Sequence, residues 1–230
     1  TGKWIIPGER LLALYLNVNG NHKLVINELF PQEKDLGVEL VWYNDVQDGA
    51  EILSQFVEKD KPIGIDKVWP ARFLLRLQEL GAGSKFVNGS MIVDYVRMVK
   101  DEHEQQLMRE ASLANDKVME KLIPLVNKGY TETELNKLVR DLYAESGHSG
   151  VSFDPITAYG KSGADPHHVT DNTKGKRGDS VVLDIGGILN DYCSDMTRTV
   201  FLGEVSDKAR EVYEIVKEAQ RRGIEAAKPG

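Results

Sequence analysis

The chain has 230 residues, 41% of them hydrophobic and 28% charged, which is typical of a globular protein and not of a disordered or fibrous one. A net charge of −7 without a basic stripe argues against nucleic acid as the main partner, and no apolar run reaches the roughly 18 residues that a membrane span needs. The single cysteine, Cys193, excludes an intramolecular disulfide framework and predicts a reducing, cytoplasmic compartment.

The first 89 residues alternate between predicted strands and predicted helices. Two apolar runs flank Asn19-Gly20, a dipeptide that tolerates positive φ at both central positions of a hairpin turn. Further strands are expected within 38–43, 62–69 and 84–89, and helices within 50–60 and 71–83. This alternation predicts an α/β arrangement of layers.

The pattern changes over residues 89–100, so we place a domain boundary close to residue 95 and predict domains at 1–95 and 96–230. A charged segment of period 3.6 predicts a helix from Asp101 to about 127, before Gly129.

A second helix and a set of strands complete the chain. Thr131 and Glu134 have the spacing of a capping box, which predicts a helix that closes at Gly147. Ser206 is the expected N-cap of a last helix. Strands are expected within 151–160, 179–187 and 191–203. Helices followed by strands indicate an α+β second domain.

The stretch DIGGILNDYCSD, residues 184–195, predicts two strands around a turn, with Asp184 near one end and Asp195 at the other. If the turn is centred between Leu189 and Asn190, the two carboxylates lie directly opposite each other on one face, about 5 Å apart at Cβ. Like charges so placed repel each other. The pair then needs a shared proton, a guanidinium such as that of Arg198, or a bound cation.

Two interpretations of the pair stay open from the residues alone. Carboxylate oxygens suit Mn, Co, Zn or Mg, and with further ligands they could hold two ions around a bridging water. Alternatively, Asp184 is a structural carboxylate and Asp195 forms an ion pair with Arg198. Two carboxylates alone are too few for a tight metal site. Gly186 and Gly187 leave room beside Asp184 for a substrate or another backbone.

A loop rich in Gly, Ser and Asp, residues 157–172, carries His167 and His168. A loop imidazole near a strand end can act as acid, base or oxyanion donor near neutral pH, although two solvated histidines are the commoner case. Pro166 restricts the backbone before His167 and favours one orientation of it. The other histidines receive no role: His22, His103 and His148.

Five motifs follow one another along the chain: R-x-V-K-x-x-x-E at 97–104, G-Y-T-E-T-E-L at 129–135, P-H at 166–167, D-I-G-G at 184–187 and S-D-M-T-R-T at 194–199. In this order they resemble the pita-bread metallopeptidases, specifically Xaa-Pro aminopeptidases and Xaa-Pro dipeptidases (prolidases). The resemblance implies an α/β creatinase-like N-terminal domain followed by the first half of an α+β pita-bread (creatinase/aminopeptidase) catalytic domain. Residues 1–10 resemble a stretch inside that N-terminal domain, past its usual start, so we expect a fragment of a longer protein.

The resemblance also implies the roles of particular residues. The family's dinuclear site uses two Asp, one His and two Glu to hold two divalent ions, such as Mn, Co or Zn. Asp184 and Asp195 correspond to the two Asp, and Thr197 to a threonine behind the second Asp that orients it. His167 corresponds to a histidine that faces the substrate and helps to stabilise the tetrahedral intermediate.

The implied reaction is metal-dependent hydrolysis of the bond preceding proline in proline-containing peptides, by a homodimer. The metal-binding His and both Glu belong to the second pita-bread half. We therefore expect these 230 residues alone to be inactive and to bind metal weakly. Dipeptidase and aminopeptidase activity stay open.

Two other functions are weighed against this one. A creatinase-like amidinohydrolase works without metals and lacks the ligand set, so the presence of Asp184 and Asp195 disfavours it. An inactive, peptidase-like binding module is disfavoured by the same pair, because a site without a cation has no reason to tolerate the repulsion.

Overall fold

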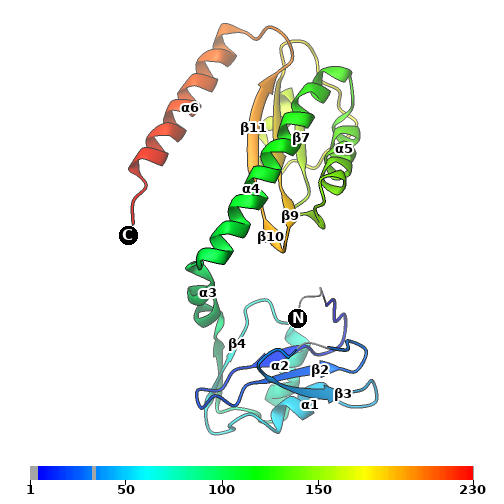
Figure 1. Ribbon diagram of the computed structural model, residues 1–230, viewed down its shortest axis with the longest axis vertical. Helices are drawn as coiled ribbons and strands as arrows, with labels where there is room; N and C mark the ends of the chain where they lie inside the picture. The colour runs from blue at the N-terminus through cyan, green and yellow to red at the C-terminus, as the bar shows by residue number, and fades with distance from the viewer. Residues whose placement is uncertain (1–4, 33–34, 230) are drawn as a thin grey trace. The chain divides into compact units, whose positions relative to one another are not determined.

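The computed structural model describes residues 5–32 and 35–229 (Figure 1). Residues 1–4, which begin the first stretch of family resemblance, lie outside the described residues. The chain divides into two compact units, Thr1–Val99 and Lys100–Gly230. In the described part of the chain, no helix is both long enough and apolar enough to cross a membrane.

Unit 1 has the predicted α/β arrangement. Its strands are β1 (Ala13–Tyr15), β2 (Lys23–Asn27), β3 (Glu39–Tyr43), β4 (Pro62–Ile65) and β5 (Lys85–Asn88), and its helices are α1 (Gly49–Ser54), α2 (Ala71–Glu79) and α3 (Ser90–Met98). Strands β1 and β2 form the predicted antiparallel hairpin, whereas β2–β3 and β4–β5 pair in parallel. Leu11, Val25, Tyr43, Leu53 and Leu77 form its core.

Helix α3 was not predicted from the sequence. It contains Ile92, Val93, Tyr95 and Val96, residue types that favour strands over helices when only local preference is counted. All four side chains are exposed, so burial in unit 1 does not explain this helix either.

Unit 2 contains two three-stranded antiparallel sheets, ordered β11-β8-β7 and β10-β9-β6. Its helices are α4 (Glu102–Leu122), α5 (Glu132–Glu145) and α6 (Asp207–Ala226), with 3₁₀ turns η1 (Ile123–Lys128) and η2 (Gly160–Ala164). Its strands are β6 (Gly150–Val151), β7 (Ile156–Tyr159), β8 (Ser180–Ile185), β9 (Gly187–Leu189), β10 (Tyr192–Cys193) and β11 (Met196–Phe201). The predicted α+β class is therefore confirmed.

The helix starts follow the sequence signals. Thr131 and Glu134 form the predicted capping box of α5, and Ser206 caps α6. Helix α4 has a capping box of its own, made by Asp101 and Glu104. Its regular part is shorter than predicted and ends at Leu122, because Pro124 has no N–H for the helical ladder, and the chain continues as 3₁₀ turns.

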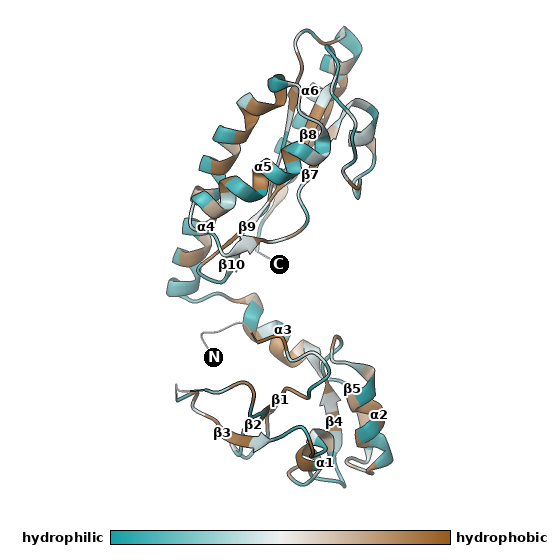
Figure 2. Ribbon diagram, turned by 90° about the vertical axis from the view of Figure 1, so that its right-hand side faces the viewer, coloured by the Kyte–Doolittle hydropathy of each residue, from teal (hydrophilic) through white to brown (hydrophobic). Residues whose placement is uncertain are grey.

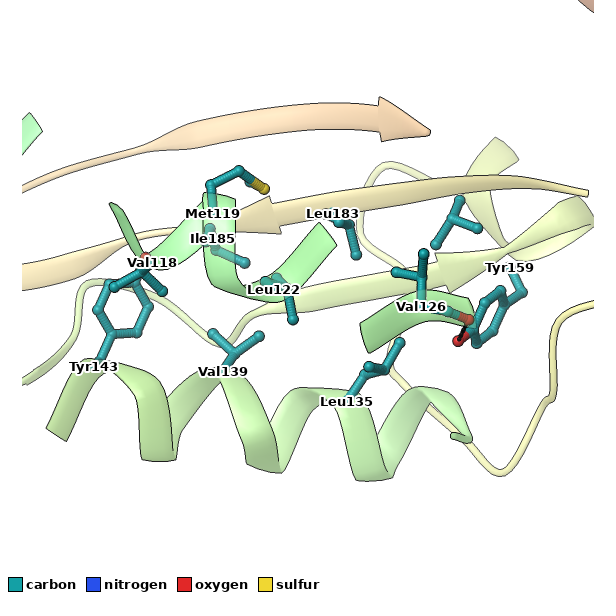
Figure 3. Close-up of a cluster of buried hydrophobic side chains, with 11 residues drawn as sticks. Val118, Met119, Leu122, Val126, Leu135, Val139, Tyr143, Tyr159, Leu183 and Ile185 are labelled. Atoms are coloured by element: carbon teal, nitrogen blue, oxygen red, sulfur yellow. Dashed lines mark hydrogen bonds between the residues drawn. The ribbon is translucent and has the colours of Figure 1, made fainter. Parts of the chain in front are cut away.

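The core of unit 2 lies between the sheet and helices α4 and α5 (Figure 3). The helices contribute side chains such as Val118, Leu122, Leu135, Val139 and Tyr143. Both show hydrophobic and hydrophilic residues in alternation, as expected of helices with one buried side (Figure 2).

Strand β8 supplies the other side of this core. Val181, Leu183 and Ile185 are fully buried against the helices. Since successive side chains of a strand point to opposite faces, Val182 and Asp184 lie on the face away from α4 and α5. The alternation of this strand therefore places Asp184 outside the hydrophobic core.

Candidate metal-binding site

The hairpin that carries the two aspartates has a register different from the predicted one. Asp184 pairs with Thr197, and Leu189 pairs with Tyr192. The turn is centred between Asn190 and Asp191, which have φ of 50° and 65°. Asn and Asp tolerate this left-handed conformation, so they form the two-residue turn and Leu189 stays in the strand.

The predicted direct opposition of Asp184 and Asp195 is therefore wrong. The register places Asp195 two positions from the partner of Asp184, so the two acids are diagonal neighbours, a relation that typically separates residues by roughly 7–8 Å. A shift of two positions preserves the face on which a side chain lies. Both residues line one cavity of about 610 Å³, as expected if their carboxylates share a face.

The two carboxylates have different surroundings. Asp184 is half-buried, and the Thr197 hydroxyl donates a hydrogen bond to its Oδ1 over 2.7 Å. Asp195 is exposed. Thr197 thus contacts the first aspartate, whereas the family resemblance placed it behind the second.

No basic side chain neutralises this pair within the part of the chain that the structure describes. Arg198 donates instead to the carbonyl oxygen of Thr197, over 2.9 Å. The alternative in which Asp195 forms an ion pair with Arg198 is therefore wrong. Of the three ways to neutralise the pair, the guanidinium of Arg198 is thus excluded.

The charges of the pair reach the core of unit 2. Burial raises the pKa of Tyr143, and the negative charges of Asp195 and Asp184 raise it further. The Tyr143 hydroxyl donates to the Oδ1 atom of the buried Asn115. A cation held by the two aspartates would weaken this effect on Tyr143.

The loop brings His167 to the same cavity as the two aspartates. Its side chain is exposed, and its backbone N–H donates to Asp165 Oδ1 over 2.9 Å. Phe153 and Ile156 also line this cavity, so polar and apolar groups converge on it.

The glycines beside Asp184 are needed for close packing. A Cβ atom on Gly186 would lie 2.1 Å from the carbonyl oxygen of Ser194 and 2.2 Å from Ser152 Oγ. One on Gly187 would lie 2.4 Å from the Tyr143 ring. The expected room is thus filled by the protein's own backbone and side chains.

A second group of acidic and imidazole side chains was missed by the sequence analysis. Glu132, His168 and Asp171 place one potential ligand atom each within 4.8 Å of the others. Glu132 is fully buried, and its Oε2 lies 2.6 Å from His168 Nε2. The doubled histidine of the P-H-H sequence was the available signal, but solvated histidines were the commoner expectation.

Comparison with known proteins identifies the family. Residues 106–230 match the model of metallopeptidase family M24, and residues 1–99 match the creatinase/prolidase N-terminal domain. The chain belongs to metallopeptidase family M24. Membership of M24 confirms the predicted creatinase-like and pita-bread architecture and implies divalent metal ions as cofactors.

Some of the similar proteins have names that specify a peptide bond before proline. An Xaa-Pro dipeptidase of Pyrococcus horikoshii is 34% identical over 174 residues, which are 76% of this chain and 50% of that protein. A solved dipeptidase from P. horikoshii OT3 has a TM-score of 0.88 at 30% identity, covering 97% of this chain and 63% of its own. An X-Pro aminopeptidase from Thermotoga maritima MSB8 has a TM-score of 0.78 at 30% identity, covering 95% and 63%. The chain thus spans about half the length of the first relative and less than two thirds of the two solved chains.

Proposed function

We propose that the protein containing these residues hydrolyses the peptide bond preceding proline in a metal-dependent reaction, with Asp184 and Asp195 among the metal ligands. One observation carries the proposal: two carboxylates without a basic partner line a single cavity together with His167. The names of two relatives, an Xaa-Pro dipeptidase and an X-Pro aminopeptidase, support the choice of an X-Pro bond.

The donor set fits a divalent cation. Carboxylate oxygens are hard ligands, and a cation between these diagonal neighbours would offset the mutual repulsion of two negative charges that pair with no basic side chain in the described residues. Thr197 donates to one oxygen of Asp184 and so leaves the other oxygen for coordination. We propose two ions of Mn, Co or Zn, with one His and two Glu from outside residues 1–230 as further ligands.

The residues of this chain would have separate roles. The bound ions would supply an activated water and polarise the scissile carbonyl. His167, in the same cavity, would donate a hydrogen bond to the oxyanion that develops during attack. Phe153 and Ile156 would offer an apolar wall to the proline ring.

The experiment is an assay of the full-length protein with an X-Pro dipeptide and with a longer X-Pro peptide, each with and without Mn. We expect hydrolysis that requires metal and that is abolished by Asp184→Asn and by Asp195→Asn. Asp154→Asn is the matched control, because Asp154 lines the same cavity but pairs with Arg140 over 2.7 Å. Absence of hydrolysis of both peptides in the presence of metal would contradict the proposal.

Three further expectations concern the assembly and location of the whole protein and the behaviour of residues 1–230 alone. We propose that it is a homodimer and that it acts in the cytoplasm, where a single cysteine stays reduced. We also propose that residues 1–230 alone are inactive and bind metal weakly, since two carboxylates are too few ligands for a tight site. Titration of this chain with Mn, Co and Zn tests the last point, and tight stoichiometric binding would contradict it.

A further inference from the structure

The carboxylate of Glu132 is the most completely surrounded acidic group of unit 2. It has no exposed surface. Its Oε1 accepts a hydrogen bond from the Tyr159 N–H over 2.9 Å, and its Oε2 accepts one from the Asp171 N–H over 3.2 Å. The same Oε2 lies 2.6 Å from His168 Nε2. A buried charge is stable only with such partners. Loss of one partner leaves a buried polar group unpaired and lowers the free energy of unfolding.

These contacts attach the segment 168–173 to the start of helix α5. Glu132 is the first residue of α5, where the helix dipole favours a negative charge. Its own N–H donates to the Thr173 carbonyl, and the Thr133 N–H donates to the Asp171 carbonyl. His168 and Asp171 are thereby held against a rigid element on either side of the exposed Val169.

His167 lies next to these attachments in the chain. It directly precedes His168 in the chain and is itself exposed. The turn that contains it is closed by the His168 N–H donating to the Asp165 carbonyl, over 3.2 Å. The His167 N–H also donates to the Asp165 carboxylate within the same turn, but among the described residues the nearest side-chain contact that joins this turn to another element is the one between His168 and Glu132.

We propose that Glu132 and His168 are positioning residues that hold His167 in the cavity beside Asp184 and Asp195. A third metal ion at Glu132, His168 and Asp171 is a poorer explanation, because the imidazole nitrogen and the carboxylate already satisfy each other. The inference rests on the proposed function, in which His167 stabilises the oxyanion.

The first test is kinetic and uses the full-length enzyme loaded with Mn. Glu132→Gln keeps the shape of the side chain but removes its charge and one acceptor oxygen. We expect kcat to fall by about 100-fold with KM and the metal requirement unchanged, because misplacement by about 1 Å is enough to cause such a loss. His168→Gln should act in the same direction, and it is the second variant if Glu132→Gln folds poorly.

Glu134→Gln is the matched control. Glu134 lies in the same first turn of α5 and its Oε2 accepts from the Thr131 N–H, so this variant weakens the helix start without touching the loop. We expect its kcat to be that of the wild type. An equal loss of kcat in Glu134→Gln would overturn the proposal in favour of a general effect on α5.

A double-mutant cycle separates positioning from stability. In a His167→Ala background, Glu132→Gln should cause no further loss of kcat, because the residue that it positions is absent. A loss as large as in the wild-type background would overturn the proposal.

A last measurement does not need activity. In Glu132→Gln, the His167 imidazole NMR signals should shift or broaden and the Asp171 amide should exchange faster, with neither change in Glu134→Gln. Unchanged His167 signals would overturn the positioning role even if the protein hydrolyses X-Pro peptides. Conversely, shifted signals in a protein without peptidase activity would support the positioning and contradict only the proposed function.

Discussion

Two groups of carboxylates in unit 2 differ in how far their charges are satisfied. Glu132 is fully buried and uses both oxygens on two backbone N–H groups and an imidazole. Asp184 and Asp195 line an open cavity, and the only side-chain hydrogen bond described for either is that from Thr197. On this comparison, closeness of potential ligand atoms is a weaker criterion for a metal site than the absence of other partners. Carboxylates that still lack partners are better candidates for binding a cation.

The largest expected effect is on the buried group. Glu132→Ala should lower the free energy of unfolding by about 3–5 kcal/mol, because it leaves His168 and two backbone N–H groups without their acceptor. Urea denaturation measures this. Glu134→Ala, in the same turn of α5 but exposed, should cost clearly less. Equal losses in the two variants would show that burial of Glu132 carries no special weight.

The next effect tests the packing beside the open pair. Gly186→Ala should destabilise the chain by about 1–3 kcal/mol, because the new Cβ would meet the Ser194 carbonyl and Ser152 Oγ. Gly150→Ala, in β6, is the control, since nothing lies within 4 Å of its added Cβ. Similar melting temperatures for both variants would contradict the described hairpin packing.

A smaller, pH-dependent effect concerns His148, a buried side chain close to Gly187. Burial lowers its pKa below the ordinary 6.5, and neither ring nitrogen has a hydrogen-bond partner in the described residues. The unfolded chain therefore takes up a proton more readily than the folded one. The contribution to stability is complete above about pH 6.5 and is lost as the pH falls through the folded-state pKa. His148→Leu should show a shallower loss of unfolding free energy between pH 7.5 and 5.5 than the wild type, and an equal slope would contradict this.

The smallest effect is expected at the proposed metal ligands. Without metal, Asp184→Asn and Asp195→Asn should leave the unfolding free energy unchanged or raise it by a few tenths of a kcal/mol, because each removes one of two like charges. In the full-length protein, both variants should lose the rise in melting temperature that Mn gives the wild type. A large destabilisation by either variant without metal would assign the aspartates a structural role like that of Glu132.

Local signals predicted much of this fold. The capping box at Thr131, the N-cap at Ser206 and the hairpin around Asn19-Gly20 all depend on residues close together in sequence. The register of the Asp184 hairpin was wrong because Leu189 is compatible with both strand and turn, and only the positive φ of the next two residues decides between them.

The Glu132 network was beyond local prediction for a different reason. Glu132 and His168 are 36 positions apart, and Glu132 belongs to a helix start whose neighbours Thr133 and Glu134 are exposed. Nothing in the local pattern marks it as buried. His167 and His168 both line the cavity, and only the fold, which places Glu132 beside His168, distinguishes them, so the sequence could not assign His168 to the network.

The two-residue turn at Asn190 and Asp191 has a consequence for how this protein can vary. Both residues are at positive φ and form the whole turn, so it cannot absorb an added residue. Such a residue must either form a β-bulge or move the strand pairing by one position. Moving the pairing by one would turn Asp195 to the opposite face from Asp184. The number of residues between the two acids is therefore under stronger constraint than the identity of most residues between them.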